Sequence, residues 1–158
     1  MDIGDDQIIS VVLVLALLLL SRVRDLLDNS GLFAATITGL TVSLLGHWTW
    51  LIALFIFLVI GSIATKWKLE EKKLLSLEEA NEGLRSWKNV LANGGAVSIM
   101  AIYNFISPGE EWIYFAAIAS ISVALSDTLA SEIGSLDTRT RSITTLQSVP
   151  AGTNGGMS

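Results

Sequence analysis

The sequence "WLIALFIFLVIGSIA", residues 50–64, decides the fold. It contains no charged residue and is apolar at almost every position. A helix needs about 20 mostly apolar residues to cross the hydrocarbon core of a bilayer. We therefore predict a membrane-spanning helix here, and the neighbouring segments are interpreted around it.

The composition of the whole chain supports a membrane protein. Of its 158 residues, 51% are hydrophobic and 16% are charged. The mean hydropathy is +0.59, which is far more apolar than is usual for a soluble domain of this size. Without cysteine the chain has no disulfide or thiolate site, and its single histidine, His47, excludes a histidine cluster. A net charge of −5 argues against nucleic acid as a partner.

Four further segments complete the layout, at about residues 3–23, 31–46, 90–106 and 112–129. The acidic start "MDIGDDQ" differs from the basic start of a secretory signal, so we expect the first segment to be retained. The second segment contains threonines, serine and glycines, which suit contact between helices. The predicted fold class is all-α, a polytopic transmembrane helical bundle with about five membrane segments.

The five-segment layout places every positive charge on one side of the membrane. These residues are Arg22, Arg24, Lys66, Lys68, Lys72, Lys73, Arg85, Lys88, Arg139 and Arg141. The positive-inside rule then predicts an outside N-terminus and a cytoplasmic C-terminus for an integral protein of the cell membrane. His47 falls at the outer interface beside Trp48 and Trp50, where we expect it to anchor the chain rather than bind a ligand.

Residues 66–88 form a predicted cytoplasmic connector. Apolar residues recur in it at helical spacing among mixed charges, namely Leu74, Leu77, Leu84 and Trp87. This pattern is typical of an amphipathic helix on the membrane surface or against the bundle. We expect its acidic and basic residues to form a solvated face. The chain is predicted to be one integral-membrane domain, residues 1–158, with a cytoplasmic glycine-rich segment at residues 135–158.

The sequence "SDTLASEIG", residues 126–134, places two carboxylates where the last apolar run ends. At 100° per residue, a stripe of small residues runs along this segment, comprising Ala116, Ser120, Ala124, Asp127, Ser131 and Gly134. Such a stripe marks the side that another helix approaches, so we expect Asp127 to point into the bundle. The direction of Glu132 is left open. A simple ion pair of Asp127 with Arg139, Arg141 or a lysine is the alternative.

Three polar residues lie near the start of the fourth segment. Arg85, Asn89 and Asn93 are four residues apart and would share one side of a helix that begins before the membrane. The guanidinium group suits a phosphate, and the amides offer both donors and acceptors, so the row is predicted to be a binding surface. Alternatively, the two asparagines bond neighbouring helices.

The sequence "PAGTNGGMS", residues 150–158, is rich in glycine. Its backbone N–H groups and hydroxyls could cradle a phosphate. It lacks the Gly-Lys-Ser/Thr ending of a P-loop, which excludes that motif. A disordered tail is the alternative interpretation.

Together, "NEGLRSWKNVLANGG", "SDTLASEIG" and "RSITTLQSVPAGTNGGMS" resemble the integral-membrane phytyl-phosphate kinase family of plants and cyanobacteria, with its archaeal, bacterial and animal relatives. The resemblance implies phosphorylation of an isoprenyl monophosphate, such as phytyl or geranylgeranyl phosphate, by CTP or another nucleoside triphosphate. "SDTLASEIG" is also similar to the Gly-Asp-x-x-Ala-Ser pattern of CTP-dependent polyprenol and dolichol kinases, with Ser126 in place of glycine. Members of the family usually continue into further membrane segments, so this chain is either a short member or truncated.

The resemblance also implies roles for individual residues. Asp127, with Glu132, would hold Mg²⁺ at the donor phosphates. Arg85 and Lys88 would bind phosphate oxygens, and Asn89 and Asn93 would orient the nucleotide or metal-bound water. The predicted cofactor-binding set is completed by Ser131, Gly152, Thr153, Gly155, Gly156 and Ser158. The prenyl tail would lie among segments two to five in contact with membrane lipids, and oligomeric state is left open.

Two kinds of rival function remain. A polyprenol kinase or a CTP-dependent lipid cytidylyltransferase would use the same acidic and glycine-rich elements. A membrane transporter or a noncatalytic scaffold is the second kind. A transport site is expected near the bilayer midplane, whereas these polar groups cluster on one side.

Overall fold

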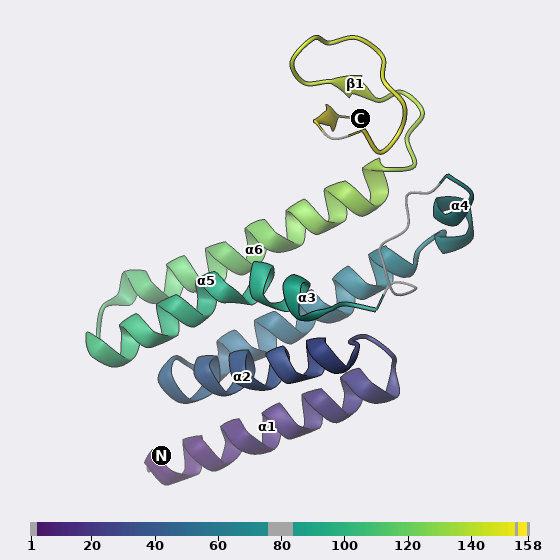
Figure 1. The fold of residues 1–158 in the computed structure, drawn as a ribbon. Helices are drawn as coiled ribbons and strands as arrows, with labels where there is room; N and C mark the ends of the chain where they lie inside the picture. Colours follow the sequence, from purple (N-terminus) through teal and green to yellow (C-terminus); the bar gives the residue numbers. More distant parts are fainter. Residues whose placement is uncertain (1–2, 76–83, 154, 158) are drawn as a thin grey trace.

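The computed structural model describes residues 3–75, 84–153 and 155–157, with side chains described from residue 7 onward. Its elements are α1 (Ile3–Val23), α2 (Asn29–Leu45), α3 (Trp48–Lys66), α4 (Leu69–Leu74), α5 (Trp87–Ile106), α6 (Glu111–Gly134), β1 (Arg141–Ser142) and β2 (Gly156–Met157). The five long helices run antiparallel in chain order and form an elongated bundle (Figure 1).

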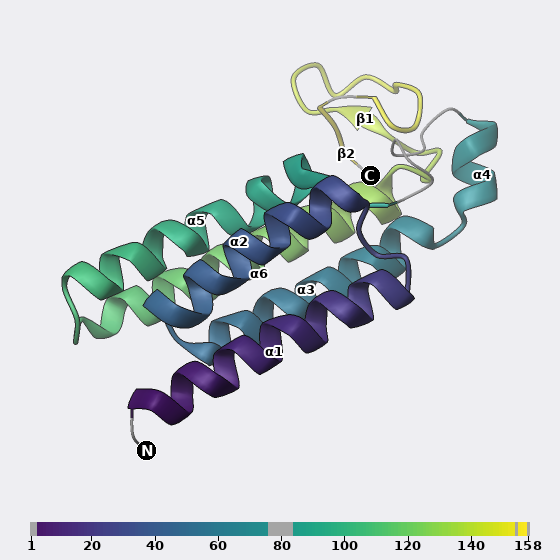
Figure 2. The same ribbon diagram turned by 60° about the horizontal axis from the view of Figure 1, so that its bottom comes forward.

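The packing order of the helices differs from their order in the sequence. The most extensive contact joins α2 and α5, while α6 packs against both α5 and α3, and α1 packs against α2. A turned view shows α4 and the two short strands gathered at the end of the bundle where α1 and α6 finish (Figure 2). The α2–α3 and α5–α6 turns lie at the opposite end (Figure 1).

Helix length and composition identify the bundle as a membrane structure. Three helices, α3, α5 and α6, are long and apolar enough to cross a membrane, and the apolar parts of α1 and α2 are shorter. Large apolar side chains such as Leu19, Phe33, Ile63 and Phe115 are 65–70% exposed on the outer faces of the bundle. An exposed apolar surface of this kind indicates a membrane environment. The predicted fold class is confirmed.

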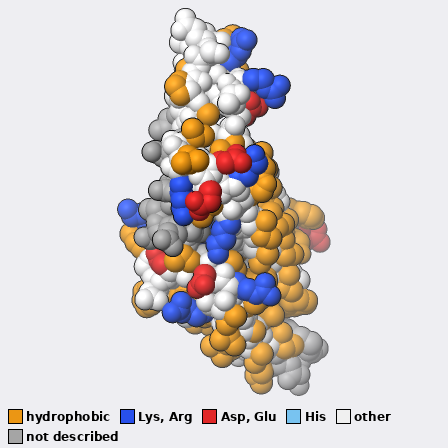
Figure 3. Space-filling model, turned by 90° about the vertical axis from the view of Figure 1, so that its right-hand side faces the viewer, with side chains coloured by type: hydrophobic (Ala, Val, Ile, Leu, Met, Phe, Trp, Pro, Cys, Tyr) orange, Lys and Arg blue, Asp and Glu red, His pale blue; other side chains and the backbone are white. Residues whose placement is uncertain are grey.

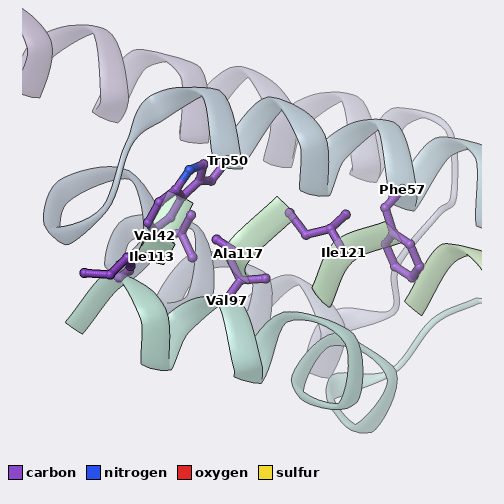
Figure 4. Close-up of a cluster of buried hydrophobic side chains, with 8 residues drawn as sticks. Val42, Trp50, Phe57, Val97, Ile113, Ala117 and Ile121 are labelled. Atoms are coloured by element: carbon purple, nitrogen blue, oxygen red, sulfur yellow. The ribbon is translucent and has the colours of Figure 1, made fainter. Parts of the chain in front are cut away.

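A continuous hydrophobic core joins α2, α3, α5 and α6. Its buried members are Val42, Trp50, Phe57, Val97, Ala101, Ile113, Ala117 and Ile121. Figure 4 shows these side chains following the bundle axis, with Trp50, Val42 and Ile113 together and Phe57 farther along. The inward face of α6 is therefore the row of Ile113, Ala117 and Ile121, each four residues after the last.

The ends of two helices differ from the predicted boundaries. α6 continues to Gly134, well beyond the apolar run, so that the whole of "SDTLASEIG" is helical. α5 begins at Trp87 because Ser86 caps it. The side-chain oxygen of Asn89 accepts hydrogen bonds from the backbone N–H and the hydroxyl of Ser86, at 3.4 and 3.0 Å, which closes the capping box.

The connector is not the continuous amphipathic helix that the leucine spacing predicts. In its described part, α4 is a separate six-residue helix between the end of α3 at Lys66 and the start of α5 at Trp87. Arg85 lies in an extended bridge with Leu27, and Leu77 lies outside the described residues. The expected solvated charged face is also wrong at one position, since Lys72 is 1% exposed while Leu74 is 86% exposed. An ion pair inside the bundle, described below, explains this reversal.

The two ends of the bundle differ in chemistry. Element order brings the basic residues to the end where α1, α3 and α6 finish, and Figure 3 looks onto this end, where Lys and Arg side chains are interspersed with Asp and Glu. At the other end, His47 caps α3 through Thr49 and stacks on Trp48, with ring centroids 5.7 Å apart. The gathering of the Lys and Arg residues at one end is as predicted. The assignment of that end to the cytoplasm remains a prediction.

Two adjacent glycines of α5 test the packing of α2 against α5. A methyl group on Gly94 would lie 2.8 Å from Cγ2 of Thr38, whereas one on Gly95 would meet nothing within 4 Å. We expect Gly94→Ala to lower the free energy of unfolding by about 1–3 kcal/mol through overpacking. Gly95→Ala should be neutral or stabilise by up to about 1 kcal/mol through helix propensity. Unfolding of both variants in detergent micelles measures the difference, and equal effects would contradict this packing.

Candidate functional site

Arg85 is a buried cation at the basic end of the bundle. The residue is 3% exposed, and its guanidinium carbon lies 5.2 Å from the ring centroid of Phe57, a cation–π arrangement. Gly61 leaves the space for it, because an added Cβ there would lie 2.6 Å from Nη2 of Arg85. The side chain is thus enclosed by α3 rather than exposed on the membrane surface.

The backbone of Arg85 is fixed by the turn between α1 and α2. Its N–H donates to the carbonyl oxygen of Leu26 at 3.1 Å, and its carbonyl oxygen accepts from the N–H of Asp28 at 3.1 Å. Asp28 also caps α2 by accepting a 2.7 Å hydrogen bond from the N–H of Gly31. Arg85 therefore precedes α5 instead of lying on it, which corrects the prediction that it shares a helix with Asn89 and Asn93.

Arg85, Asn89 and Asn93 nevertheless line the same cavity. This cavity has a volume of about 90 Å³ and lies between α1, α2, α3 and α5, with room for several water-sized groups. Its walls are mainly apolar and include Val14, Leu17, Leu51, Leu54 and Phe55. The structure thus places a cation and two amides beside an apolar slot.

The two asparagines bond within α5. The side-chain nitrogen of Asn93 donates to the carbonyl oxygen of Asn89 at 2.7 Å, while the side-chain oxygen of Asn89 serves the helix cap. Within the described part of the chain, neither side chain bonds to another helix. The alternative interpretation, in which the asparagines bond neighbouring helices, is therefore not supported. Both residues line the cavity, and each amide has a second polar atom that can form a hydrogen bond.

A second polar cluster joins α3, α4 and α6. The ammonium group of Lys72 donates to Oε2 of Glu132 at 2.6 Å and to the carbonyl oxygens of Ala64 and Thr65 at 3.1 and 3.4 Å. The hydroxyl of Thr65 lies 2.7 Å from Oε1 of Glu132. The side chains of Lys72 and Glu132 are 2% and 12% exposed. This is a nearly buried ion pair in which both carboxylate oxygens are bonded.

Asp127 does not point into the bundle as predicted. It is exposed, and it does not line the cavity beside Arg85. The reason is the choice of inward face on α6: Asp127 lies about 80° around the helix from the centre of the row Ile113, Ala117 and Ile121. Asp127 and Arg85 therefore do not line one shared cavity.

The two predicted metal ligands also point apart. Asp127 and Glu132 are five residues apart on an unbroken helix, a rotation of about 140°. Among the described residues, no group of three or more His, Cys, Asp or Glu side chains could hold a metal ion. Glu132 is engaged by Lys72 and Thr65, so the pair does not form a joint Mg²⁺ site. Lys88 and Ser131 are exposed and lie outside the cavity.

The glycine-rich segment is folded in its described part. β1 and β2 pair antiparallel, with Arg141 opposite Met157. Gly152 and Gly155 adopt left-handed backbone conformations, with φ of 74° and 75°, which glycine takes without strain. The N–H groups of Thr153 and Gly156 donate to Pro150 and Thr153, so these two groups are not available to a phosphate. Ser158 lies outside the described residues.

The described residues that follow α6, 135–153 and 155–157, are called the cap below. An exposed ion pair lies near the start of this cap. The N–H of Arg139 donates to Oδ1 of Asp137 at 2.8 Å, and the guanidinium group lies 3.3 Å from each carboxylate oxygen. The hydrogen bonds from Arg139 lower the pKa of Asp137 below its usual value of 3.8. The Asp137 carboxylate is therefore ionised at neutral pH and holds Arg139 in place.

Sequence reasoning missed Lys72 and Thr65. Lys72 stands in a run of charges that resembles a solvated face, and Thr65 lies at the end of an apolar helix. The partners of the ion pair are 60 residues apart, and no local pattern links them. An acidic residue just past the predicted cytoplasmic end of a membrane segment was the one available signal that a buried basic partner exists.

Comparison with known proteins shows related membrane proteins. A family model described as "Integral membrane protein DUF92" matches residues 12–158. An uncharacterised membrane protein of Methanocaldococcus jannaschii is 34% identical over 150 residues, 94% of this chain and 61% of that protein. One from Synechocystis sp. is 32% identical over 85% of this chain and 54% of the relative.

A plant relative is the protein VTE6, chloroplastic, of Arabidopsis thaliana. It is 30% identical over 140 residues, which cover 77% of this chain and 42% of that protein. The chain therefore spans between about two fifths and three fifths of the lengths of these relatives. No solved structure matches the chain.

Proposed function

The chain belongs to the DUF92 family of integral membrane proteins, and we propose that it is a prenyl-phosphate kinase. It would convert an isoprenyl monophosphate, such as phytyl or geranylgeranyl phosphate, to the diphosphate, with CTP or another nucleoside triphosphate as donor. The sequence motifs and the relationship to VTE6 support this proposal at the level of the family. The chain spans less than two thirds of the length of these relatives.

The observation that carries the proposal is the buried guanidinium of Arg85 beside an apolar cavity. An isoprenyl monophosphate has the same two parts, an anionic head and a hydrocarbon tail. The planar guanidinium group matches phosphate oxygens, and Asn89 and Asn93 add hydrogen-bonding groups. A volume of about 90 Å³ suits the phosphate-proximal end of the tail, and the rest of the chain would lie among the helices and lipids.

The reaction needs charge neutralisation more than a base. An oxygen of the acceptor phosphate attacks the γ-phosphorus of the donor, and the bond from that phosphorus to the β,γ-bridging oxygen breaks. The products are the prenyl diphosphate and the nucleoside diphosphate. Both reactants are anions, so a fixed cation at the acceptor reduces their repulsion. Arg85 would supply this cation, and Lys88 would assist from the exposed surface.

Magnesium enters the proposal through the nucleotide. Mg²⁺ commonly keeps several waters and binds one or two carboxylates together with substrate phosphates, where it neutralises their charge. Asp127 is the one predicted carboxylate not occupied by an internal partner in the described structure. We assign it to a nucleotide-borne Mg²⁺ because of the resemblance of "SDTLASEIG", and Glu132 is no longer part of this assignment.

The reaction would take place at the cytoplasmic face of the cell membrane. All basic residues lie at one end of the bundle, and the positive-inside rule assigns that end to the cytoplasm. Soluble nucleotide would reach this end from water, and the prenyl phosphate would reach it from the lipid.

Purified protein with CTP, Mg²⁺ and radiolabelled geranylgeranyl or phytyl monophosphate tests the proposal. We expect prenyl diphosphate from the wild type and about a hundredfold lower kcat/KM from Arg85→Gln, because charge-assisted hydrogen bonds to phosphate are lost. Arg85→Lys should restore only part of the rate, since lysine lacks the planar fork. Arg24→Gln removes an exposed charge at the same end and should leave the rate unchanged.

The rivals give other outcomes in the same assay. Phosphorylation of prenols identifies a polyprenol kinase, and transfer of CMP to phosphatidate identifies a cytidylyltransferase. If folded wild-type protein makes no diphosphate, the kinase proposal fails, and uptake into proteoliposomes then tests the transporter. Equal losses in Arg85→Gln and Arg24→Gln would overturn the role of Arg85.

A further inference from the structure

A polar hollow lies on the cap that follows α6. It has a volume of about 530 Å³ and is lined by Asp137, Thr138, Arg139, Arg141 and Ser148. This size falls within the range of small-molecule sites. The hollow shares no lining residue with the cavity beside Arg85, so it is a separate candidate site at the same basic end of the bundle.

The lining groups suit a phosphate anion. Two arginines and two hydroxyl residues line the hollow, and guanidinium is the side-chain group that best matches phosphate oxygens in pairs. Asp137 already binds Arg139 and offsets its charge. Arg141 forms no ion pair with any residue that the structure describes, so its charge is the one that an incoming anion would compensate.

The backbone holds Arg141 in a defined place. It pairs with Met157 in the β1–β2 ladder and forms a bridge with Ser148. Thr140, just before it, is 4% exposed, and its carbonyl oxygen accepts from the N–H of Val149 at 3.0 Å. The hollow is therefore built from a folded segment, which reduces the ordering that a ligand must impose.

The glycine-rich segment lies directly beside these arginines but uses its own amides. The N–H of Ile143 donates to the carbonyl oxygen of Gly155 at 2.8 Å, while Thr153 and Gly156 donate to acceptors within the segment. Gly156 packs tightly against Thr140, since an added Cβ would lie 2.6 Å from Cγ2 of that residue. The glycines thus serve the close packing of the cap, and the arginines supply the anion-binding groups.

We propose that this hollow, through Arg141 and Arg139, binds the phosphates of the donor nucleoside triphosphate. The inference rests on the proposed kinase function for the identity of the ligand, and on the hollow itself for the binding of a polyphosphate. Arg141 would contact phosphate oxygens directly, Ser148 and Thr138 would donate hydroxyl hydrogen bonds, and Asp137 would hold Arg139 in position.

Direct binding of inorganic tripolyphosphate and of a nonhydrolysable CTP analogue, measured by calorimetry on the chain of residues 1–158 in phosphatidylcholine nanodiscs, tests the site. We expect Arg141→Gln to weaken both affinities about tenfold or more and Arg139→Gln to weaken them less. Arg22→Gln is the matched control, because Arg22 is also an exposed arginine paired with an aspartate at the basic end. A loss in Arg22→Gln as large as that in Arg141→Gln would overturn the site.

Two further experiments are needed. The first distinguishes a lipid headgroup from a nucleotide as the source of the bound phosphate, and the second distinguishes failure of the anion site from failure of the kinase proposal. Added phosphatidylglycerol that abolishes tripolyphosphate binding would show that the arginines bind lipid headgroups, and the nucleotide assignment would fail. If polyphosphate binding depends on Arg141 but the protein has no kinase activity, the anion site is supported and the kinase proposal is wrong. If Arg141→Gln makes prenyl diphosphate with an unchanged KM for the nucleotide, the kinase proposal is supported and the proposed nucleotide site is wrong.

Discussion

Lys72→Met is expected to lower the free energy of unfolding by about 3–5 kcal/mol, because it leaves the Glu132 carboxylate nearly buried without its cation. The side chains of the pair are only 2% and 12% exposed, and their charged atoms are 2.6 Å apart. Lys72 also donates to the carbonyl oxygens of Ala64 and Thr65 at the end of α3. One substitution thus removes three hydrogen bonds that attach α4 to the bundle.

A double-mutant cycle separates the pair from its surroundings. Lys72→Met combined with Glu132→Met should recover much of the lost stability, because replacing both members of a buried ion pair by apolar groups is often neutral. Lys68→Met removes a neighbouring exposed ion pair with Glu71 and should change stability by about 0–1 kcal/mol. Chemical unfolding in detergent micelles measures five proteins, namely the wild type, Lys72→Met, Glu132→Met, the double variant and Lys68→Met. A Lys72→Met effect no larger than that of Lys68→Met would mean that the buried pair is not formed.

Gly31→Ala is expected to lower the free energy of unfolding by about 3 kcal/mol or more, which is the upper end of the usual range for overpacking. An added Cβ would run into the backbone carbonyl oxygen of Arg85, which cannot rotate away as a side chain can. The clash would separate the first turn of α2 from the extended segment at Arg85 and break its bridge with Leu27. The prediction therefore couples a glycine on α2 to the position of the proposed phosphate ligand.

Gly39→Ala is the matched control on the same helix. Gly39 is also buried, but its added Cβ would make only an ordinary contact, 3.4 Å from Cγ2 of Val14. It should cost little, because the gain in helix propensity offsets any small adjustment. Unfolding free energies of both variants, together with prenyl-phosphate binding, test the idea. Equal stability of the two variants would show that α2 does not approach Arg85 as closely as described.

The arrangement of the site follows from which face each helix buries. α6 carries small or polar residues on more than one side, so the stripe through Ser120 and Asp127 was as plausible an inner face as the row of Ile113, Ala117 and Ile121. Packing against α3 and α5 selects the second. That selection turns Glu132 inward to Lys72 and leaves Asp127 exposed.

Hydropathy and charge along the sequence determined the membrane class, the number of long helices and the gathering of basic residues at one end. These properties depend on runs of neighbouring residues, so they are readable without contacts. The motifs likewise indicated the family. Only the tertiary structure decided that Arg85 is enclosed beside Phe57, that Lys72 is buried with Glu132, and that the cap arginines line a hollow. Each of these depends on contacts between distant segments, and the energy of burying a charge is set by the partners that such contacts provide.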